Sequence, residues 1–167
     1  MATGLRWEAL VEADYGAVSD LGDAAHPTLF ERQEVLEQKM RLCPEGCRKL
    51  TDGTRLLGYG ICHPYWLHAI PPLDTFLPPL ERPADCLYIH DVVVDPSARG
   101  HGSAGRFVAH VRAVAARLAL PALALVSVYG THPMWARYGF AVVDDPALAP
   151  KLASYGASAR YMISRHG

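Results

Sequence analysis

The 167-residue chain has no excess of charge of either sign and no long apolar run. Its 16 Lys and Arg residues nearly balance its 17 Asp and Glu residues, so the formal net charge is −1. This balance gives no electrostatic reason to expect nucleic acid or an anionic membrane as a partner. No apolar run approaches the roughly 18 residues that a membrane span needs. The first residues lack the basic-then-apolar order of a signal peptide, and we expect a cytoplasmic protein.

Cysteine is also scarce, and its spacing argues against a metal site. Cys43-Pro-Glu-Gly-Cys47 resembles half of a zinc site, but no second pair of this kind is present. Cys62 lies in an apolar strand pattern, so we expect buried free thiols and no metal. Half of the residues are apolar. We expect one domain over residues 1–167 that buries roughly 70% of its unfolded surface.

Hydrophobic periodicity and turn signals predict elements in the order βααβββαβαββ. The expected helices begin at Glu12 and Glu31 and cover 102–120 and 133–138, and the expected strands cover 5–11, 47–51, 55–62, 86–94, 122–128, 140–143 and 159–164. Hairpin strands mixed with strand–helix–strand crossovers indicate an α/β or α+β fold with a mixed sheet. Residues 64–85 interrupt this regularity with six prolines, and a loop of this length is usually functional.

The most informative stretch runs from Val92 to Gly105. A β-branched strand pattern stops at Asp95-Pro96, and an arginine and three glycines then lead into a long helical pattern. Such a turn points several backbone N–H groups and the positive end of a helix dipole at one spot. The spot suits a phosphorylated ligand.

Three ligand classes use a turn of this kind. A P-loop needs a Lys-Ser or Lys-Thr pair at its end, which this turn lacks. Gly100-His-Gly-Ser-Ala-Gly105 spells the G-x-G-x-x-G of dinucleotide sites, but it lies in mid-chain and residues 120–125 contain no acid for the ribose. The third class is the pyrophosphate of coenzyme A.

Arg99-Gly-His-Gly102-Ser-Ala104 matches the R/Q-x-x-G-x-G/A signature of the GCN5-related N-acetyltransferases (GNAT). The strand at 124–128 and Met134-Trp-Ala-Arg-Tyr-Gly-Phe140 follow in that family's order and spacing. The chain therefore resembles this family over nearly its whole length. The resemblance implies an acyl-CoA N-acyltransferase fold: a mostly antiparallel sheet of six or seven strands with helices on both faces and splayed central parallel strands. It also implies an amine acceptor, and a homodimer is common in the family.

The resemblance implies acetyl-CoA as cosubstrate. Pantetheine would pair with the main chain of the strand, and the pyrophosphate would lie on the turn, where Gly102 and Ala104 lack bulk and Arg99 adds a charge. The residues implied for coenzyme A are Val92, Val93, Val94, Arg99, Gly100, His101, Gly102, Ser103, Ala104 and Gly105.

Acetyl transfer to an amine needs a base, because deprotonating an alkylammonium at pH 7 costs roughly 4–5 kcal/mol. Strand alternation predicts that Tyr88, His90, Val92 and Val94 share one face and that Asp91 lies on the other. Many family members carry a glutamate at the place of Tyr88. This chain instead offers His90, which resembles the proton-relaying histidine of serotonin-type arylalkylamine N-acetyltransferases. A buried structural histidine is the alternative.

The leaving thiolate can be helped by an acid, and here the chain departs from the family pattern. Trp135 stands where the family often has a tyrosine, and an indole cannot donate in that role. Tyr129, at the end of a strand, is the substitute that we expect. The alternatives are a packing role for Tyr129 and a thiolate that takes its proton from water. Tyr138 is expected to pack in the core.

The acceptor site is expected under the proline-rich loop from Tyr65 to Asp85 and the first two helices. Tyr65, Trp66 and Phe76, together with Tyr88, are the candidate wall, and Asp74 or Glu81 would attract an ammonium group. The alternative is that Trp66 and Phe76 only anchor the loop. Three functions remain open: acetyl transfer to a primary amine of a small molecule or peptide, acyl-CoA binding without chemistry, and nucleotide binding. Release of free thiol with an amine distinguishes the first from the others.

Overall fold

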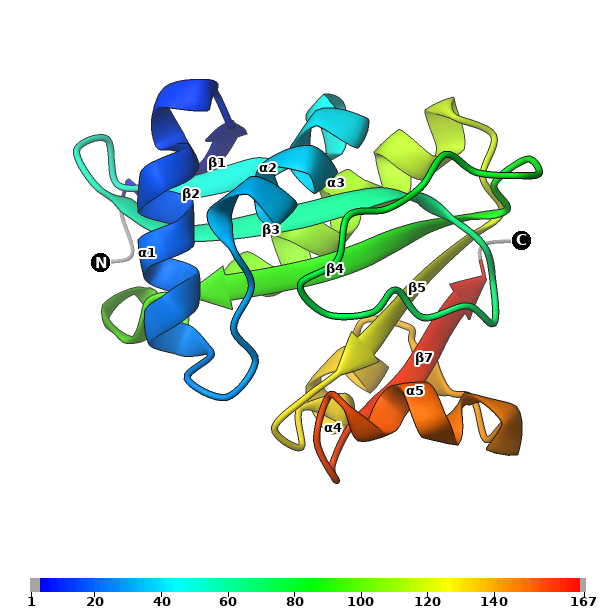
Figure 1. Ribbon diagram of the computed structural model, residues 1–167. Helices are drawn as coiled ribbons and strands as arrows, with labels where there is room; N and C mark the ends of the chain where they lie inside the picture. Colours follow the sequence, from blue (N-terminus) through cyan, green and yellow to red (C-terminus); the bar gives the residue numbers. More distant parts are fainter. Residues whose placement is uncertain (1–3, 166–167) are drawn as a thin grey trace.

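The computed structural model describes residues 4–165, which form a seven-stranded sheet in the order β1-β2-β3-β4-β5-β7-β6 (Figure 1). The strands are β1 (Arg6–Ala9), β2 (Arg48–Thr51), β3 (Leu56–Tyr65), β4 (Cys86–Val94), β5 (Ala122–Ser127), β6 (Ala141–Val142) and β7 (Arg160–Arg165). The helices are α1 (Tyr15–Ala25), α2 (Gln33–Leu42), α3 (Ser103–Arg117), α4 (His132–Arg137) and α5 (Ala149–Ala153). Every neighbouring pair is antiparallel except β4 and β5, which confirms the expected mixed sheet.

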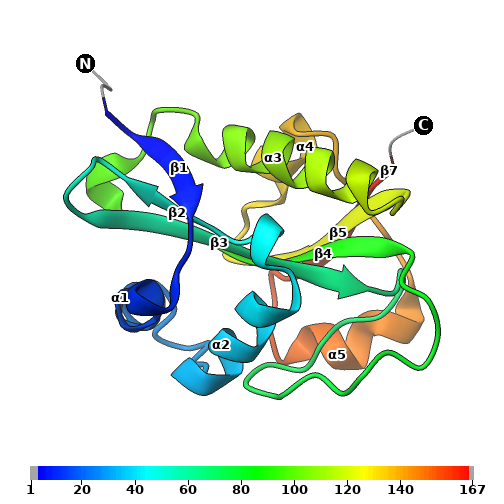
Figure 2. The same cartoon turned by 90° about the horizontal axis from the view of Figure 1, so that it is seen from above.

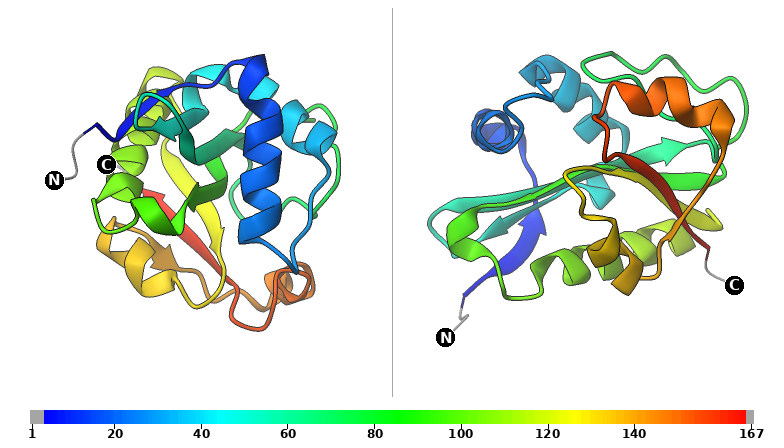
Figure 3. Two further views of the ribbon diagram at one scale, coloured as in Figure 1. Left: turned by 90° about the vertical axis from the view of Figure 1, so that its left-hand side faces the viewer. Right: turned by 90° about the horizontal axis from the view of Figure 1, so that it is seen from below.

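Helices cover both faces of the sheet. Helices α3 and α4 lie on one face, and α1, α2, α5 and the loop 66–85 lie on the other (Figure 2; Figure 3, right). The apolar side of α3 packs Phe107, Val111 and Val114 against Leu87 and other residues of the central strands. On the opposite face, residues of α1 and α2 pack against β3. No helix within residues 4–165 is long and apolar enough to cross a membrane.

Two elements differ from the sequence expectation. Strand β3 continues through Pro64 to Tyr65, although the prolines predicted a loop from residue 64 onward. The proline is tolerated because β2 pairs with β3 only as far as Gly60, so no ladder bond from its nitrogen is needed on that side. The short helix α5 was not predicted, because five residues with a proline in the first turn carry no readable periodicity.

The central parallel strands part from each other after three paired residues. Leu87, Tyr88 and Ile89 of β4 pair with Leu123, Ala124 and Leu125 of β5, and the pairing then ends. Figure 1 shows β5 turning away from β4 beyond this point. The backbone of β4 from His90 onward is therefore free of a neighbour on the β5 side, which confirms the expected splay.

A β-bulge reverses the alternation of side chains along β4. Ile61 of β3 pairs with Asp91 and Cys62 pairs with Ile89, so His90 is the extra residue. His90 and Asp91 both contact the segment between α1 and α2, at Glu31 and His26, respectively. Val92 instead packs on the α3 side of the sheet. The expectation that Asp91 lies opposite His90 is therefore wrong, because simple alternation fails at a bulge.

Candidate active site

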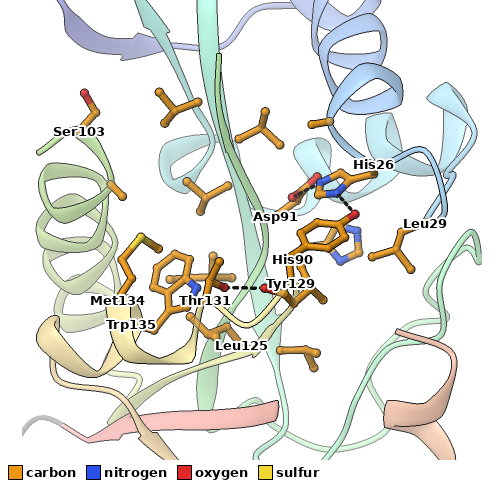
Figure 4. A pocket seen from close by; sticks show the side chains of 18 of the residues that line it. His26, Leu29, His90, Asp91, Ser103, Leu125, Tyr129, Thr131, Met134 and Trp135 are labelled. Atoms are coloured by element: carbon orange, nitrogen blue, oxygen red, sulfur yellow. Dashed lines mark hydrogen bonds and ion pairs between the residues drawn. The ribbon is translucent and has the colours of Figure 1, made fainter. Parts of the chain in front are cut away.

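A pocket of about 740 Å³ opens where β4 and β5 part (Figure 4). Its walls come from the second half of β4, the start of α3, the segment after β5 and the stretch that follows α1. These elements are distant in the sequence, and the divergence of the two strands brings them around one space. One end of the pocket lies at the start of α3 and the other lies beneath α1.

The glycine turn forms the first end of the pocket. Gly100 and Gly102 have φ angles of 86° and 70°, a left-handed conformation that costs a side-chain-bearing residue about 1–2 kcal/mol. Gly102 caps α3, whose first N–H groups have no partner within the helix and face the pocket mouth. The Arg99 Nε donates to the carbonyl of Val94 at 3.1 Å, which ties the turn to the end of β4.

Eight of the ten residues implied for coenzyme A line this pocket, and His101 and Gly105 do not. His101 is exposed. Gly105 serves the packing of α3 against α4, because a Cβ there would lie 2.9 Å from the ring of Tyr138. The turn thus lies where the sequence predicted it. Most of its residues line the pocket, whereas Gly105 allows α3 and α4 to pack closely.

His90 and Glu31 form the first histidine–carboxylate pair of the pocket. The His90 Nε2 lies 2.6 Å from the Glu31 Oε1, and the His90 side chain is only 1% exposed. Its Nδ1 is buried and has no hydrogen-bond partner among residues 4–165. Burial raises the pKa of Glu31, but the charge and hydrogen bond of His90 outweigh this effect, and the pKa lies below its ordinary value. Glu31 therefore fixes the orientation of the His90 ring, and the Nδ1 of His90 has no hydrogen-bond partner among residues 4–165.

A second pair was missed from the sequence. The His26 Nε2 lies 2.9 Å from the Asp91 Oδ1, and the His26 Nδ1 lies 2.9 Å from the Tyr129 hydroxyl oxygen. The Tyr59 hydroxyl donates to the other carboxylate oxygen of Asp91 at 2.6 Å. In the sequence, His26-Pro27 signals only the end of a helix, and nothing local connects it to residues 91 and 129.

A model of the acetyltransferase (GNAT) family matches residues 8–140. The chain belongs to the GNAT acetyltransferase family. Its general chemistry is therefore acetyl transfer, and among the three ligand classes compatible with the turn, family membership supports coenzyme A. No curated protein sequence matches the chain.

Solved structures of GNAT enzymes share the fold. Ard1 from Thermoplasma volcanium superposes with a TM-score of 0.73 at 13% identity, over 98% of this chain and 98% of that one. A chain of the NatC complex bound to Gag peptide and CoA has a TM-score of 0.72 at 16% identity, over 99% of this chain and 100% of that one. Arabidopsis thaliana Naa50 in complex with a bisubstrate analogue has a TM-score of 0.71 at 11% identity, over 99% of this chain and 100% of that one. At such identities the likeness shows the fold alone.

The structure does not bring the four expected acceptor residues of this GNAT chain to the pocket. Tyr65, Trp66, Phe76 and Tyr88 all lie outside its lining. Tyr88 is buried in the core between β4 and α5. Trp66 donates to the carbonyl of Arg82 at 3.1 Å and stacks beneath its guanidinium, so it anchors the loop. The apolar wall beneath α1 is instead made by Leu29, Leu73 and Tyr155.

The expected ammonium-binding role of Asp74 is also not supported by its contacts. Its carboxylate accepts from the Arg32 backbone N–H at 2.8 Å and from the Arg32 Nε at 2.9 Å. Its own N–H donates to Glu31 at 3.1 Å. Asp74 thus fixes the loop to the segment before α2 and, through Glu31, supports His90. The acidic groups that do line the pocket are Glu31 and Asp91.

Trp135 lies at the place of the family tyrosine and is mostly buried. It packs edge-on against Phe140 and Tyr138 and contributes to the pocket wall. Tyr138 packs partly buried against the same core, as expected. Tyr129 lines the pocket on the β5 side, and its hydroxyl lies toward His26 (Figure 4). Tyr138 and Tyr155 also line the pocket.

Proposed function

We propose that the chain transfers the acetyl group of acetyl-CoA to a primary amine by direct attack. The observation that carries this proposal is one pocket with a glycine turn at one end and the His90–Glu31 pair at the other. Pantetheine would extend along the unpaired edge of β4 at Val92 to Val94. The pyrophosphate would be held by the first N–H groups of α3.

His90 is the base of the proposed reaction, and it acts through a water molecule. When its Nε2–H donates to Glu31, its Nδ1 carries the free lone pair. Because the Nδ1 is buried and unpartnered, one bridging water is needed to carry the proton from the amine. Glu31 fixes the ring and stabilises the imidazolium that forms, as a carboxylate does in other histidine-based sites.

The acceptor end of the pocket is mainly apolar. Leu29, Leu73 and Tyr155 offer apolar contact, and Glu31 and Asp91, the carboxylates beside them, are each paired with a histidine. The NatC and Naa50 structures hold a peptide and a peptide-based bisubstrate analogue. We therefore propose as acceptor a primary amine that carries an apolar group next to the amine. A panel of peptides with free N-termini and of small arylalkyl and alkyl amines would distinguish peptide acceptors from small-molecule acceptors.

The test is a thiol-release assay with acetyl-CoA across this panel. His90→Gln keeps a donor for Glu31 but removes the base, and we expect kcat/KM to fall about 100-fold or more, most strongly at low pH where free amine is scarce. His68→Asn is the control, because His68 is exposed and outside the pocket. Acetyl-CoA binding without thiol release would indicate a non-catalytic binding module. An unchanged pH profile in His90→Gln would show that His90 is structural.

A further inference from the structure

The pocket contains a second set of proton-carrying groups that the proposed base does not use. Tyr129, His26 and Asp91 form a continuous hydrogen-bonded chain with two links of 2.9 Å each. The His26 and Asp91 side chains are 15% and 13% exposed, while Tyr129 is 52% exposed. The chain therefore runs from a buried carboxylate to a phenol that solvent and ligand can reach. Figure 4 shows the three side chains side by side at the edge of the pocket.

The hydrogen-bond directions in this chain follow from the charge around His26. Burial lowers the pKa of His26, but the hydrogen bond and charge of Asp91 and the charge of Glu31 outweigh burial and raise it above its ordinary value. An ionised Asp91 can only accept, so the Nε2 of His26 carries the proton of that hydrogen bond. In the protonated form of His26 the Nδ1–H also donates, and its acceptor is the Tyr129 oxygen. The titratable groups that face His26 from neighbouring elements are Asp23, Glu31, Tyr59, Asp91 and Tyr129.

In this arrangement the bond to His26 does not use the hydroxyl proton of Tyr129. Burial and the charge of Asp91 raise the pKa of Tyr129 and outweigh a hydrogen bond with the Thr28 side chain, so the phenol keeps its proton at neutral pH. Tyr129 also has a φ of 56°, a left-handed conformation that costs a residue with a side chain about 1–2 kcal/mol. Backbone strain of this kind persists where surrounding contacts hold it, and the rings of His26 and Tyr129 stack at 5.7 Å.

We propose that His26 is a positioning residue that holds Tyr129 as the proton donor to the departing coenzyme A thiolate, with Asp91 fixing His26. This inference rests on the proposed acetyl transfer. The amine nitrogen forms a bond to the carbonyl carbon, and the carbon–sulfur bond breaks with its electron pair going to sulfur. The phenol proton moves to the sulfur, and the His26 Nδ1 proton moves to the phenolate oxygen. The substrate nitrogen loses two protons to His90 and solvent, one from the ammonium before attack and one from the tetrahedral intermediate. The neutral His26 regains one proton from solvent, so one proton is released per turnover.

The two histidines thus have separate proton routes. His90 and Glu31 take a proton from the amine, while Asp91, His26 and Tyr129 return one to the thiolate. The bulge in β4 makes this division possible, because it places His90 and Asp91 on the same side of the strand. Each imidazole consequently has its own carboxylate.

The experiment measures steady-state kinetics of acetyl-CoA turnover for Tyr129→Phe, His26→Ala, His26→Asn and the double variant His26→Ala/Tyr129→Phe. We expect Tyr129→Phe and His26→Ala to lower kcat about 100-fold while the KM for acetyl-CoA changes less than about twofold. The double variant should be no slower than Tyr129→Phe, because both changes interrupt one route. His26→Asn keeps an amide donor near the position of Nδ1 and should recover part of the loss. His68→Asn is again the control.

Several outcomes would overturn this role. Unchanged kcat in His26→Ala, or a loss in the double variant equal to the product of the single losses, would show that His26 does not act through Tyr129. A rise in KM with unchanged kcat would assign His26 to ligand binding. Each of these results leaves the proposed acetyl transfer intact. Absence of thiol release by the unmodified protein with every amine would instead overturn the proposed function and this inference together.

Discussion

His90 and Asp91 are consecutive in the chain, yet both project from the same face of β4 and each engages a different histidine–carboxylate pair. The bulge opposite Ile61 and Cys62 produces this relationship. In a regular strand the two side chains would point to opposite faces. Because of this local disruption of the ladder, β4 supplies two neighbouring polar side chains, His90 and Asp91, to the pocket wall beneath α1.

The first prediction concerns the glycine turn. Gly102→Glu should abolish acetyl-CoA binding in calorimetry, because it adds a negative charge where the pyrophosphate would lie and forces a side chain into a left-handed conformation with φ of 70°. Gly156→Glu is the matched control. Gly156 has a φ of 105° in open space, so it tests backbone strain and added charge away from the pocket. Equal loss of binding in both variants, or in neither, would contradict a coenzyme A site at this turn.

The second prediction concerns acid stability and His63. Burial lowers the pKa of His63 to about 3, and its Nδ1 lies 3.0 Å from the carbonyl of Pro64. In the unfolded chain a histidine takes up a proton near pH 6.5, whereas the folded protein resists it, so stability falls as pH drops from about 6.5 toward 3. The expected loss attributable to this group between pH 7 and pH 5 is about 2 kcal/mol.

Denaturant unfolding at pH 7 and pH 5 checks this expectation. His63→Leu removes the titrating group, so the difference in unfolding free energy between the two pH values should shrink, even if the variant is less stable at both. His68→Asn removes an exposed histidine and should leave the difference unchanged. If His63→Leu keeps the full difference, other groups cause the acid sensitivity.

The third prediction concerns the attachment of the proline-rich loop. The Gln38 side chain donates to the carbonyl of Leu77 at 2.7 Å and accepts from its N–H at 2.7 Å. Gln38→Ala should leave both backbone groups without this partner and lower the free energy of unfolding by about 1–3 kcal/mol. Amide hydrogen exchange in residues 73–80 should accelerate.

Gln33→Ala is the matched control on the same helix. Gln33 is exposed, and its side-chain amide nitrogen donates to the Glu37 carboxylate and not to the loop. We expect little change in stability or exchange for this variant. Faster exchange throughout the protein in Gln38→Ala, rather than in the loop, would show that this contact supports the whole fold instead of the loop alone.

Much of the fold and the glycine turn that lines the pocket could be predicted from the sequence because their signals are local. The spacing of apolar residues predicted the central helix and strands to within a few residues. The turn from Arg99 to Gly105 was readable because a left-handed glycine, a helix N-terminus and a preceding strand are adjacent in the chain. The aromatic residues expected to contact the acceptor were predicted less well. Trp66 anchors the loop, Tyr88 packs in the core and Phe76 is exposed, and none of them lines the pocket.

The sequence by itself determined the family, the position of the glycine turn before α3 and the presence of a histidine on β4. Only the tertiary structure decided which polar groups meet in the pocket. The bulge depends on the pairing of β4 with β3, and no local sequence pattern predicts it. His26 contacts residues 65 and 103 positions away in the chain, and His90 contacts a residue 59 positions away. Hydrogen bonds over such separations exist only after the sheet and helices have packed, so neither histidine–carboxylate pair could be read before the fold.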